Sequence, residues 1–209
     1  MNDAKHEQTA HPHTRTHALM KEAAHLAART ARGAETAPLH APTPCGAWEL
    51  RALLDHWILY TAHGLEHRAL RTPLPEELAA REFAAEPGWP EAYAERLDRA
   101  VAAWAGPGAW EGEIDLGHAA MGAADIAGMV IKEMVLHGWD VATATGQHYT
   151  CSPELAGFVL GVVEEHAEIY RRYDGFAAPT QVPANATALD RALALSGRDV
   201  HAGVAAPSV

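Results

Sequence analysis

The sequence predicts an all-α protein, and three observations lead to this prediction. Apolar residues recur at the 3.6-residue period of an amphipathic helix over several long segments. Modest loops join these segments, and no strands alternate with them. The chain has 209 residues, 48% of them hydrophobic and 21% charged, which suffices for one domain with a full core and a small appendage. We therefore expect a single bundle of helices.

Five main helices and a short sixth are expected, and residues that cap or interrupt helices mark their ends. Pro73 closes the second helix, Gly146 stands at the C-cap of the fourth, and Ser152 begins the fifth as its N-cap. The segment WEGEIDLGHAAMG is too short and too rich in glycine for more than a loop or a brief strand. The helices are expected over about 16–30, 51–71, 89–104 and 123–145, within 152–175, and over 188–195.

The acidic composition limits the choice of partners and compartment. A net charge of -11 argues against a protein that binds nucleic acid or an anionic membrane, since both need a face rich in Lys and Arg. No apolar run approaches the roughly 18 residues of a membrane span, and the N-terminus lacks the apolar core of a secretory signal. Cys45 and Cys151 have no CxxC partner, so neither a disulfide framework nor a thiolate zinc site is indicated. The expected location is the cytoplasm, and the expected oligomeric state is a monomer or a homodimer.

Histidine is unusually frequent, with 14 copies, but four of them lie in the polar N-terminal segment. We expect residues 1–15 to form a disordered leader that binds metal only adventitiously. The bundle is expected over 16–176. It is followed by an extension over 177–200 that packs on the bundle, and by a frayed tail over 201–209.

A carboxylate and a histidine lie within the most apolar of the predicted helices. Between residues 126 and 141, the charged or titratable side chains are Lys132, Glu133, His137 and Asp140. Glu133 and His137 are four residues apart, so they share one face of a helix. They could form an ordinary hydrogen-bonded pair, but a buried carboxylate is usually paired or bound to a cation. Asp140 is expected either to orient a ligand histidine or to pair with Lys132 or with another helix.

The second helix supplies a candidate third ligand. His56, Tyr60 and His63 recur at helical spacing on one stripe. If this helix faces the fourth, His56 joins Glu133 and His137 in a set of two histidines and one carboxylate. Such a set with open positions describes catalytic zinc or non-haem Fe²⁺, and Ni²⁺ is a further candidate. Tyr60 and His63 would line the pocket as an acid, a base or a substrate contact, with simple packing as the alternative.

Three motifs resemble those of one family. They are TPCGAWELRALLDHW at 43–57, HGWDVATATGQ at 137–147 and FAAPTQVPANATALDRALALSGRD at 176–199. Over about residues 16–200 the chain resembles the actinobacterial DinB/YfiT-like metal-binding proteins, in particular the subgroup related to the N-terminal domain of mycothiol-dependent maleylpyruvate isomerase. The resemblance implies a DinB-like four-helix bundle with a short C-terminal extension. It also implies a divalent metal, usually zinc, between the second helix and a later one.

Carried over residue by residue, the resemblance places the metal ligands at His56, Glu133 and His137. It further implies that the metal activates a low-molecular-weight thiol, mycothiol in actinobacteria, for S-transfer or for thiol-assisted isomerisation of a small-molecule substrate. The isomerase has a further C-terminal domain that contributes a basic residue to its active site, whereas this chain has the extension 177–200. Arg198 is the candidate replacement, and an arginine that merely orders the tail is the alternative.

Two other functions stay open on the sequence. One keeps the metal without the thiol, as a lyase, cyclase, hydrolase or Fe²⁺ oxygenase in specialised metabolism. The other is a non-catalytic metal-binding protein, which requires a fourth protein ligand such as His63 or His166. Cys45 is expected to serve in packing, because the local sequence shows no basic or histidine neighbour.

Overall fold

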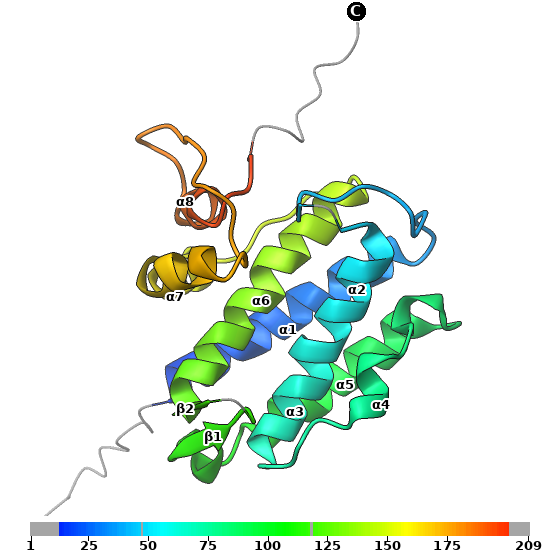
Figure 1. The fold of residues 1–209 in the computed structure, drawn as a ribbon, viewed down its shortest axis with the longest axis vertical. Coiled ribbons are helices and arrows are strands. Elements are labelled where there is room, and N and C mark those ends of the chain that lie inside the picture. Colours follow the sequence, from blue (N-terminus) through cyan, green and yellow to red (C-terminus); the bar gives the residue numbers. More distant parts are fainter. Residues whose placement is uncertain (1–12, 47, 118, 201–209) are drawn as a thin grey trace, which may run out of the picture.

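The computed structural model describes residues 13–46, 48–117 and 119–200, and the fold is mainly α-helical (Figure 1). The predicted frayed tail at 201–209 and most of the predicted leader lie outside the described residues. Residues 14 and 15 of that leader are helical, because the first helix begins before its apolar period does. Within the described part of the chain, no helix combines the length and the apolar character needed to cross a membrane.

Every predicted helix is present, although the second is divided, and the structure adds short elements between them. The two strands pair antiparallel, with Ile114 opposite Met121. The α-helices are α1 (Thr14–Ala34), α2 (Leu50–Ile58), α3 (Gly64–Ala69), α4 (Glu76–Ala79), α5 (Trp89–Ala103), α6 (Ala123–Ala144), α7 (Pro153–Arg172) and α8 (Ala188–Leu195). The short elements are the π turn η1 (Leu59–His63), the 3₁₀ turns η2 (Phe83–Ala85) and η3 (Pro107–Trp110), and the strands β1 (Glu113–Asp115) and β2 (Ala120–Gly122).

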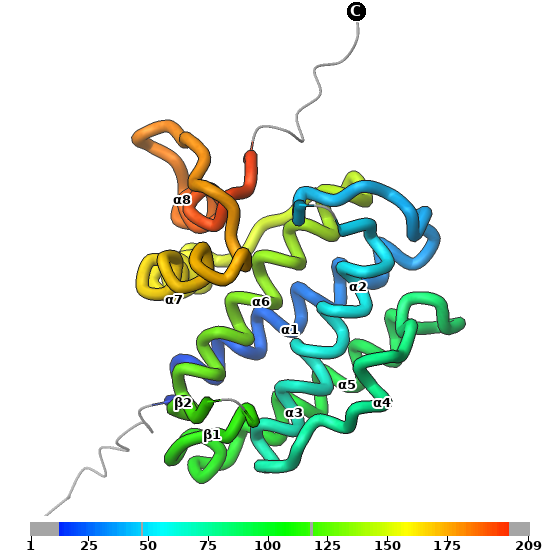
Figure 2. The backbone as a smooth tube through the Cα atoms, in the orientation of Figure 1, coloured from blue at the N-terminus to red at the C-terminus, as the bar shows by residue number. Residues whose placement is uncertain are grey.

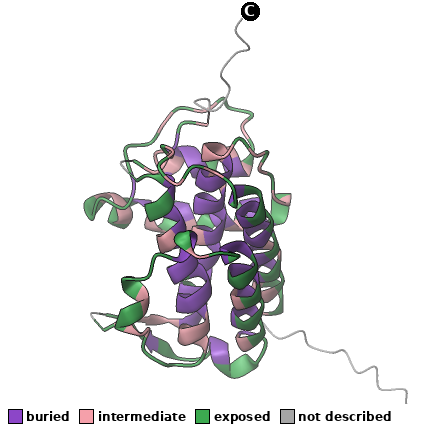
Figure 3. Cartoon of the chain, turned by 90° about the vertical axis from the view of Figure 1, so that its right-hand side faces the viewer, coloured by how far each residue is buried: buried purple, intermediate pink, exposed green. Residues whose placement is uncertain are grey.

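Helix α6 is the central element of the fold (Figure 2). It packs against α1, α2 and α7, and most of its residues are buried. Figure 3 shows that buried residues gather along the helices of the interior, while exposed residues lie on the outer helix faces and the loops. The large side chains of Met20, Trp57, Trp104 and Met134 are fully buried in the same core. Burying one such side chain contributes roughly 1.5–3 kcal/mol. Tertiary packing of apolar faces, rather than intrinsic helix propensity, therefore holds these helices together.

Helices α7 and α8 lie on one side of α6, and α2, α3 and α5 lie on the other (Figure 1). Helix α8 begins with a capping box, in which the side chains of Thr187 and Asp190 each bind the other's backbone N–H. Arg171 at the end of α7 donates to the Leu195 carbonyl oxygen at 3.2 Å. These contacts fold the segment after α7 back onto the helices, so that Arg198 reaches α6.

The second predicted helix is not a uniform α-helix, because α2 passes into the π turn Leu59–His63 before it continues as α3. The hydroxyl of Thr61 donates to the Trp57 carbonyl oxygen at 2.6 Å and forms a hydrogen bond of the same length with the Tyr93 hydroxyl. A single π turn adds one residue to a helix, so every later side chain is rotated back by about 100° relative to an uninterrupted α-helix.

The prediction that His63 lines a pocket together with His56 is wrong, and the π turn is the physical reason. His63 is buried against Phe83, with 5.1 Å between the ring centroids, and it borders a separate small cavity beside α5. The side that His56 faces is shared with Arg68, whereas an uninterrupted α-helix would place the preceding residue, His67, on that side. Burial, together with nearby arginine charges, lowers the pKa of His63 to about 4.

Replacing this buried histidine should change how stability depends on pH. Between pH 6.5 and about 4 the unfolded chain binds a proton at His63 that the folded chain does not. The free energy of unfolding therefore falls as the pH falls through that window, by at most about 1.4 kcal/mol per pH unit for this group. His63→Gln has no such proton, so urea unfolding at several pH values should show a shallower decline for the variant. Parallel pH profiles for the two proteins would contradict this explanation.

Candidate metal centre

Two helices bring the three predicted ligands together. His56 comes from α2, and Glu133 and His137 come from successive turns of α6. The Oε2 atom of Glu133 lies 3.0 Å from Nε2 of His137 and 3.6 Å from Nε2 of His56. One ligand atom of each residue lies within 4.8 Å of those of the other two. The site is open on one side, since the His56 side chain retains 29% of its exposure and that of Glu133 retains 22%.

The two oxygens of Glu133 have different partners. Oε1 accepts from the ammonium group of Lys132, which is almost completely buried and lies 4.0 Å from the centroid of the Tyr170 ring. Oε2 faces the two histidines. Burial alone would raise the pKa of Glu133, but the charges of Lys132 and His137 outweigh it and hold that pKa well below its ordinary value. Lys132 thus pairs with Glu133, and not with Asp140.

His137 is held from its other nitrogen by a buried ion pair. Its Nδ1 lies 3.0 Å from Oδ2 of Asp140, and a carboxylate can only accept, so Nδ1 carries the proton. Asp140 is fully buried and accepts two hydrogen bonds from Arg198, from Nε at 2.9 Å and from Nη2 at 2.7 Å. This arrangement points Nε2 towards Glu133 and His56, the orientation that a ligand histidine requires.

His137 bridges two carboxylates when no cation is bound, and this sets its protonation. Burial lowers the pKa of the imidazole, but Glu133 and Asp140 outweigh burial and hold it well above its ordinary value. The imidazolium therefore donates to both carboxylates. A cation that binds at Nε2 must displace this proton.

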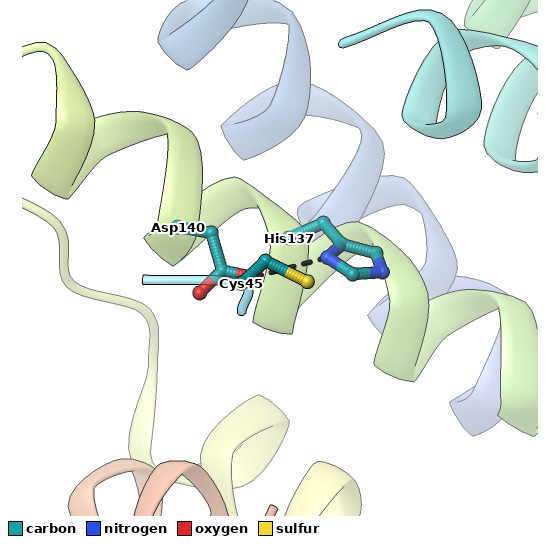
Figure 4. Close-up of side chains that lie close together, drawn as sticks. All are labelled: Cys45, His137 and Asp140. Atoms are coloured by element: carbon teal, nitrogen blue, oxygen red, sulfur yellow. Dashed lines mark hydrogen bonds and ion pairs between the residues drawn. The ribbon is translucent and has the colours of Figure 1, made fainter. Parts of the chain in front are cut away.

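Cys45 belongs to a second group of potential ligands (Figure 4). Its Sγ, a ring nitrogen of His137 and an oxygen of Asp140 lie within 4.8 Å of one another. Both oxygens of Asp140 already accept from Arg198, however, so this carboxylate is less available to a cation than that of Glu133. Of the two groups, the one with His56 is the better cation site. The histidine neighbour of Cys45 comes from α6 and could not be seen in the local sequence.

The three ligands open into a cavity of about 640 Å³. Tyr60, one turn after His56, lines it, with 4.7 Å between the two rings. Trp48, from the loop before α2, lies over both histidines, with its ring centroid 4.8 Å from that of His56 and 6.2 Å from that of His137. The apolar part of the wall includes Leu116, Ile126, Met129, Val130, Leu136 and Phe176.

The structure places the other predicted site residues as follows. Arg198 lines the cavity, but its guanidinium is engaged with Asp140 and with Ser196. His166 does not line the cavity; its Nδ1 lies 3.2 Å from the Val162 carbonyl oxygen on its own helix. Three residues at the site could not be predicted from the sequence. Trp48 and Arg68 line the cavity, and Cys45 lies beside His137.

Comparisons with models of protein families, with curated proteins and with solved structures gave no match. The three motifs quoted above nevertheless meet at one place in the fold. The first motif contains Cys45 and His56, the second contains His137 and Asp140, and the third contains Arg198. The three motifs therefore supply residues that are distant in the sequence and adjacent in the structure.

Zinc affinity should depend steeply on pH. Because the metal displaces the proton on His137, whose pKa is raised, the apparent affinity should fall about tenfold for each pH unit below that pKa. Competition of the purified protein with a chromophoric chelator at several pH values, corrected for the chelator's own protonation, measures this slope. An affinity that does not change with pH would show that no proton leaves the site.

The ion pair between Asp140 and Arg198 should matter chiefly for folding and for the orientation of His137. Arg198→Ala leaves a buried carboxylate without its main partner, which should cost about 3–5 kcal/mol of unfolding free energy. The double variant Asp140→Leu with Arg198→Met, which leaves no unpaired charge, should recover much of this loss. Chemical denaturation of the three proteins tests the pair. If Arg198→Ala were as stable as the wild-type protein, the structural role of the ion pair would be wrong, and Arg198 would again be a candidate for contacting the substrate.

Proposed function

We propose that this protein is a divalent-metal-dependent enzyme of the mycothiol-dependent isomerase or thiol S-transferase type, with zinc as its metal. The observation that carries the proposal is the convergence of His56, Glu133 and His137 on the wall of one cavity. Its volume is in the range of sites for small molecules. In the same proposal, α1, α2 with α3, α5 and α6 are the four main helices of a DinB-like bundle.

The donor atoms fit a divalent cation in their chemistry and in their surroundings. Two imidazole nitrogens and one carboxylate oxygen form a ligand set that zinc uses in enzymes, and such a set leaves positions for a substrate. The Nδ1 hydrogen bond of His137 to Asp140 is the outer contact that ligand histidines usually make. Lys132 occupies one oxygen of Glu133, which leaves Oε2 as the single ligand atom of that residue.

When bound at these residues, a zinc ion would supply Lewis acidity, which favours the thiolate form of a thiol and polarises an oxygen atom of a substrate. The chain's own residues have separate tasks. Asp140 and Arg198 would fix His137, and the apolar wall would hold the carbon skeleton of the substrate. Tyr60, whose ring lies beside that of His56, would exchange a proton through its hydroxyl group. A thiol bound there would lose its proton to solvent, and its sulfur would add to an electrophilic carbon of a double bond in a small substrate, with the π electrons of that bond moving onto a conjugated oxygen. Return of those electrons would expel the thiolate and restore the double bond, so that the addition and release balance without an oxidant or reductant.

A non-catalytic metal-binding function has less support. It needs a closed coordination sphere, but the candidates His63 and His166 lie away from the other ligands. Within the described part of the chain, the group around Oε2 of Glu133 has three members. A thiol-independent lyase, cyclase, hydrolase or Fe²⁺ oxygenase would use the same three ligands, and the binding of a thiol separates that function from the proposed one.

Elemental analysis of variants tests the metal site. The wild-type protein should retain zinc in a ratio near one to one after dialysis, and His56→Ala or His137→Ala should lose it, because two ligands hold the ion too weakly. His63→Gln is the matched control, since it changes a buried histidine of the same helical segment outside the site. Full zinc content in both alanine variants would show that the assigned ligands are wrong.

Calorimetric titration with mycothiol tests the thiol part of the proposal. The zinc-loaded protein should bind mycothiol saturably, and chelation of the zinc should abolish the binding. Binding that survives removal of the metal, or no binding to the loaded protein, would reject the thiol part. The metal part would still stand on the elemental analysis.

A further inference from the structure

Arg68 is the unexplained cation of the cavity. It lies on α3 beyond the π turn, is half-buried, and lines the same cavity as the three ligands. Its guanidinium folds back over Gly64: a methyl group added at Gly64 would lie 3.5 Å from Nη1. Since side chains of an α-helix lean towards its N-terminus, this places the charge roughly 10 Å along the helix axis from the His56 backbone.

The guanidinium of Arg68 is not used by the protein itself. No described residue forms a hydrogen bond or an ion pair with its side chain, whereas the other arginine of the cavity wall, Arg198, is bonded to Asp140. Two carboxylates border the cavity, those of Glu133 and Asp174, and neither pairs with Arg68. A partly desolvated cation without a partner is costly, so a ligand anion would be stabilised there.

We propose that Arg68 binds the carboxylate of a small organic acid and thereby defines the substrate class of the site. This inference deepens the proposed function, on which it rests. A carboxylate suits a guanidinium because it accepts two parallel hydrogen bonds. A phosphate carries more charge and would call for more than the one unpaired guanidinium that the described wall offers. The apolar side chains of the wall, among them Met129, Leu116 and Phe176, fit the carbon skeleton of the acid.

A panel of linear and aromatic monocarboxylates, each compared with its primary amide, tests the proposal on the full-length, zinc-loaded protein. The acid and its amide have nearly the same shape, so the ratio of their affinities reports the charge. At least one acid should bind about tenfold more tightly than its amide, and Arg68→Gln should remove that preference without weakening the amide. Arg172→Gln is the matched control, because it removes an exposed arginine of α7 outside the cavity.

Repeating the titration after chelation of the zinc distinguishes binding of the acid to zinc from binding to Arg68. The part of the preference that is due to Arg68 should persist without the metal. If Arg68→Gln does not fold, Arg68→Lys takes its place and should retain only part of the preference. A preference that survives in Arg68→Gln, an undiminished preference in Arg68→Lys where that variant takes its place, or an absence of preference throughout the panel would overturn the proposal. Zinc content measured on the same samples distinguishes this failure from that of the proposed metal site.

Discussion

A chain of alternating charges allows the central helix to be buried on several sides at once. Lys132, Glu133, His137, Asp140 and Arg198 follow one another in space, and each charge contacts one of opposite sign. An isolated charge would be prohibitive in this interior, but every charge of the series has a partner within hydrogen-bonding distance. Both layers of helices pack against α6, so the fold as a whole depends on this compensation. A divalent cation bound at His137 would replace the proton on that residue, so positive and negative charges would still alternate along this series.

The sequence contained enough information for the helices and for the proximity of His56, Glu133 and His137, whose role as metal ligands stays a prediction. The long apolar run around Glu133 and His137 predicts a buried helix, and the four-residue spacing places both side chains on one face. His56 could be added because it lies on a helical stripe next to buried leucines. These inferences succeed because they depend on local periodicity, which a single sequence displays. The mainly α-helical fold follows from the same periodicity, while the DinB-like four-helix arrangement remains a proposal.

The remaining parts of the site depend on contacts that no local pattern reveals. Arg198 and Asp140 are 58 residues apart in the sequence, and their pairing requires the segment after α7 to fold back. Cys45 and His137 lie close together although 92 residues separate them in the sequence. Arg68 lines the cavity and His63 does not, and the cause is the π turn between them and His56. The spacing of apolar residues in the sequence does not reveal such a turn, although the turn changes which later residues face the cavity.

The π turn also has a consequence for how this chain tolerates changes in length. A helix with one such turn holds one residue more than a plain α-helix with the same faces, so deleting a residue between 59 and 63 would relax the backbone and leave His56 and Arg68 on the same side. In the resulting α-helix, the backbone N–H four residues later would donate to the Trp57 carbonyl oxygen in place of the Thr61 hydroxyl. The two ends of the cavity are thus aligned by a helix that can lose one residue at this position without reordering its faces, whereas a further added residue would rotate Arg68 away from the side of His56.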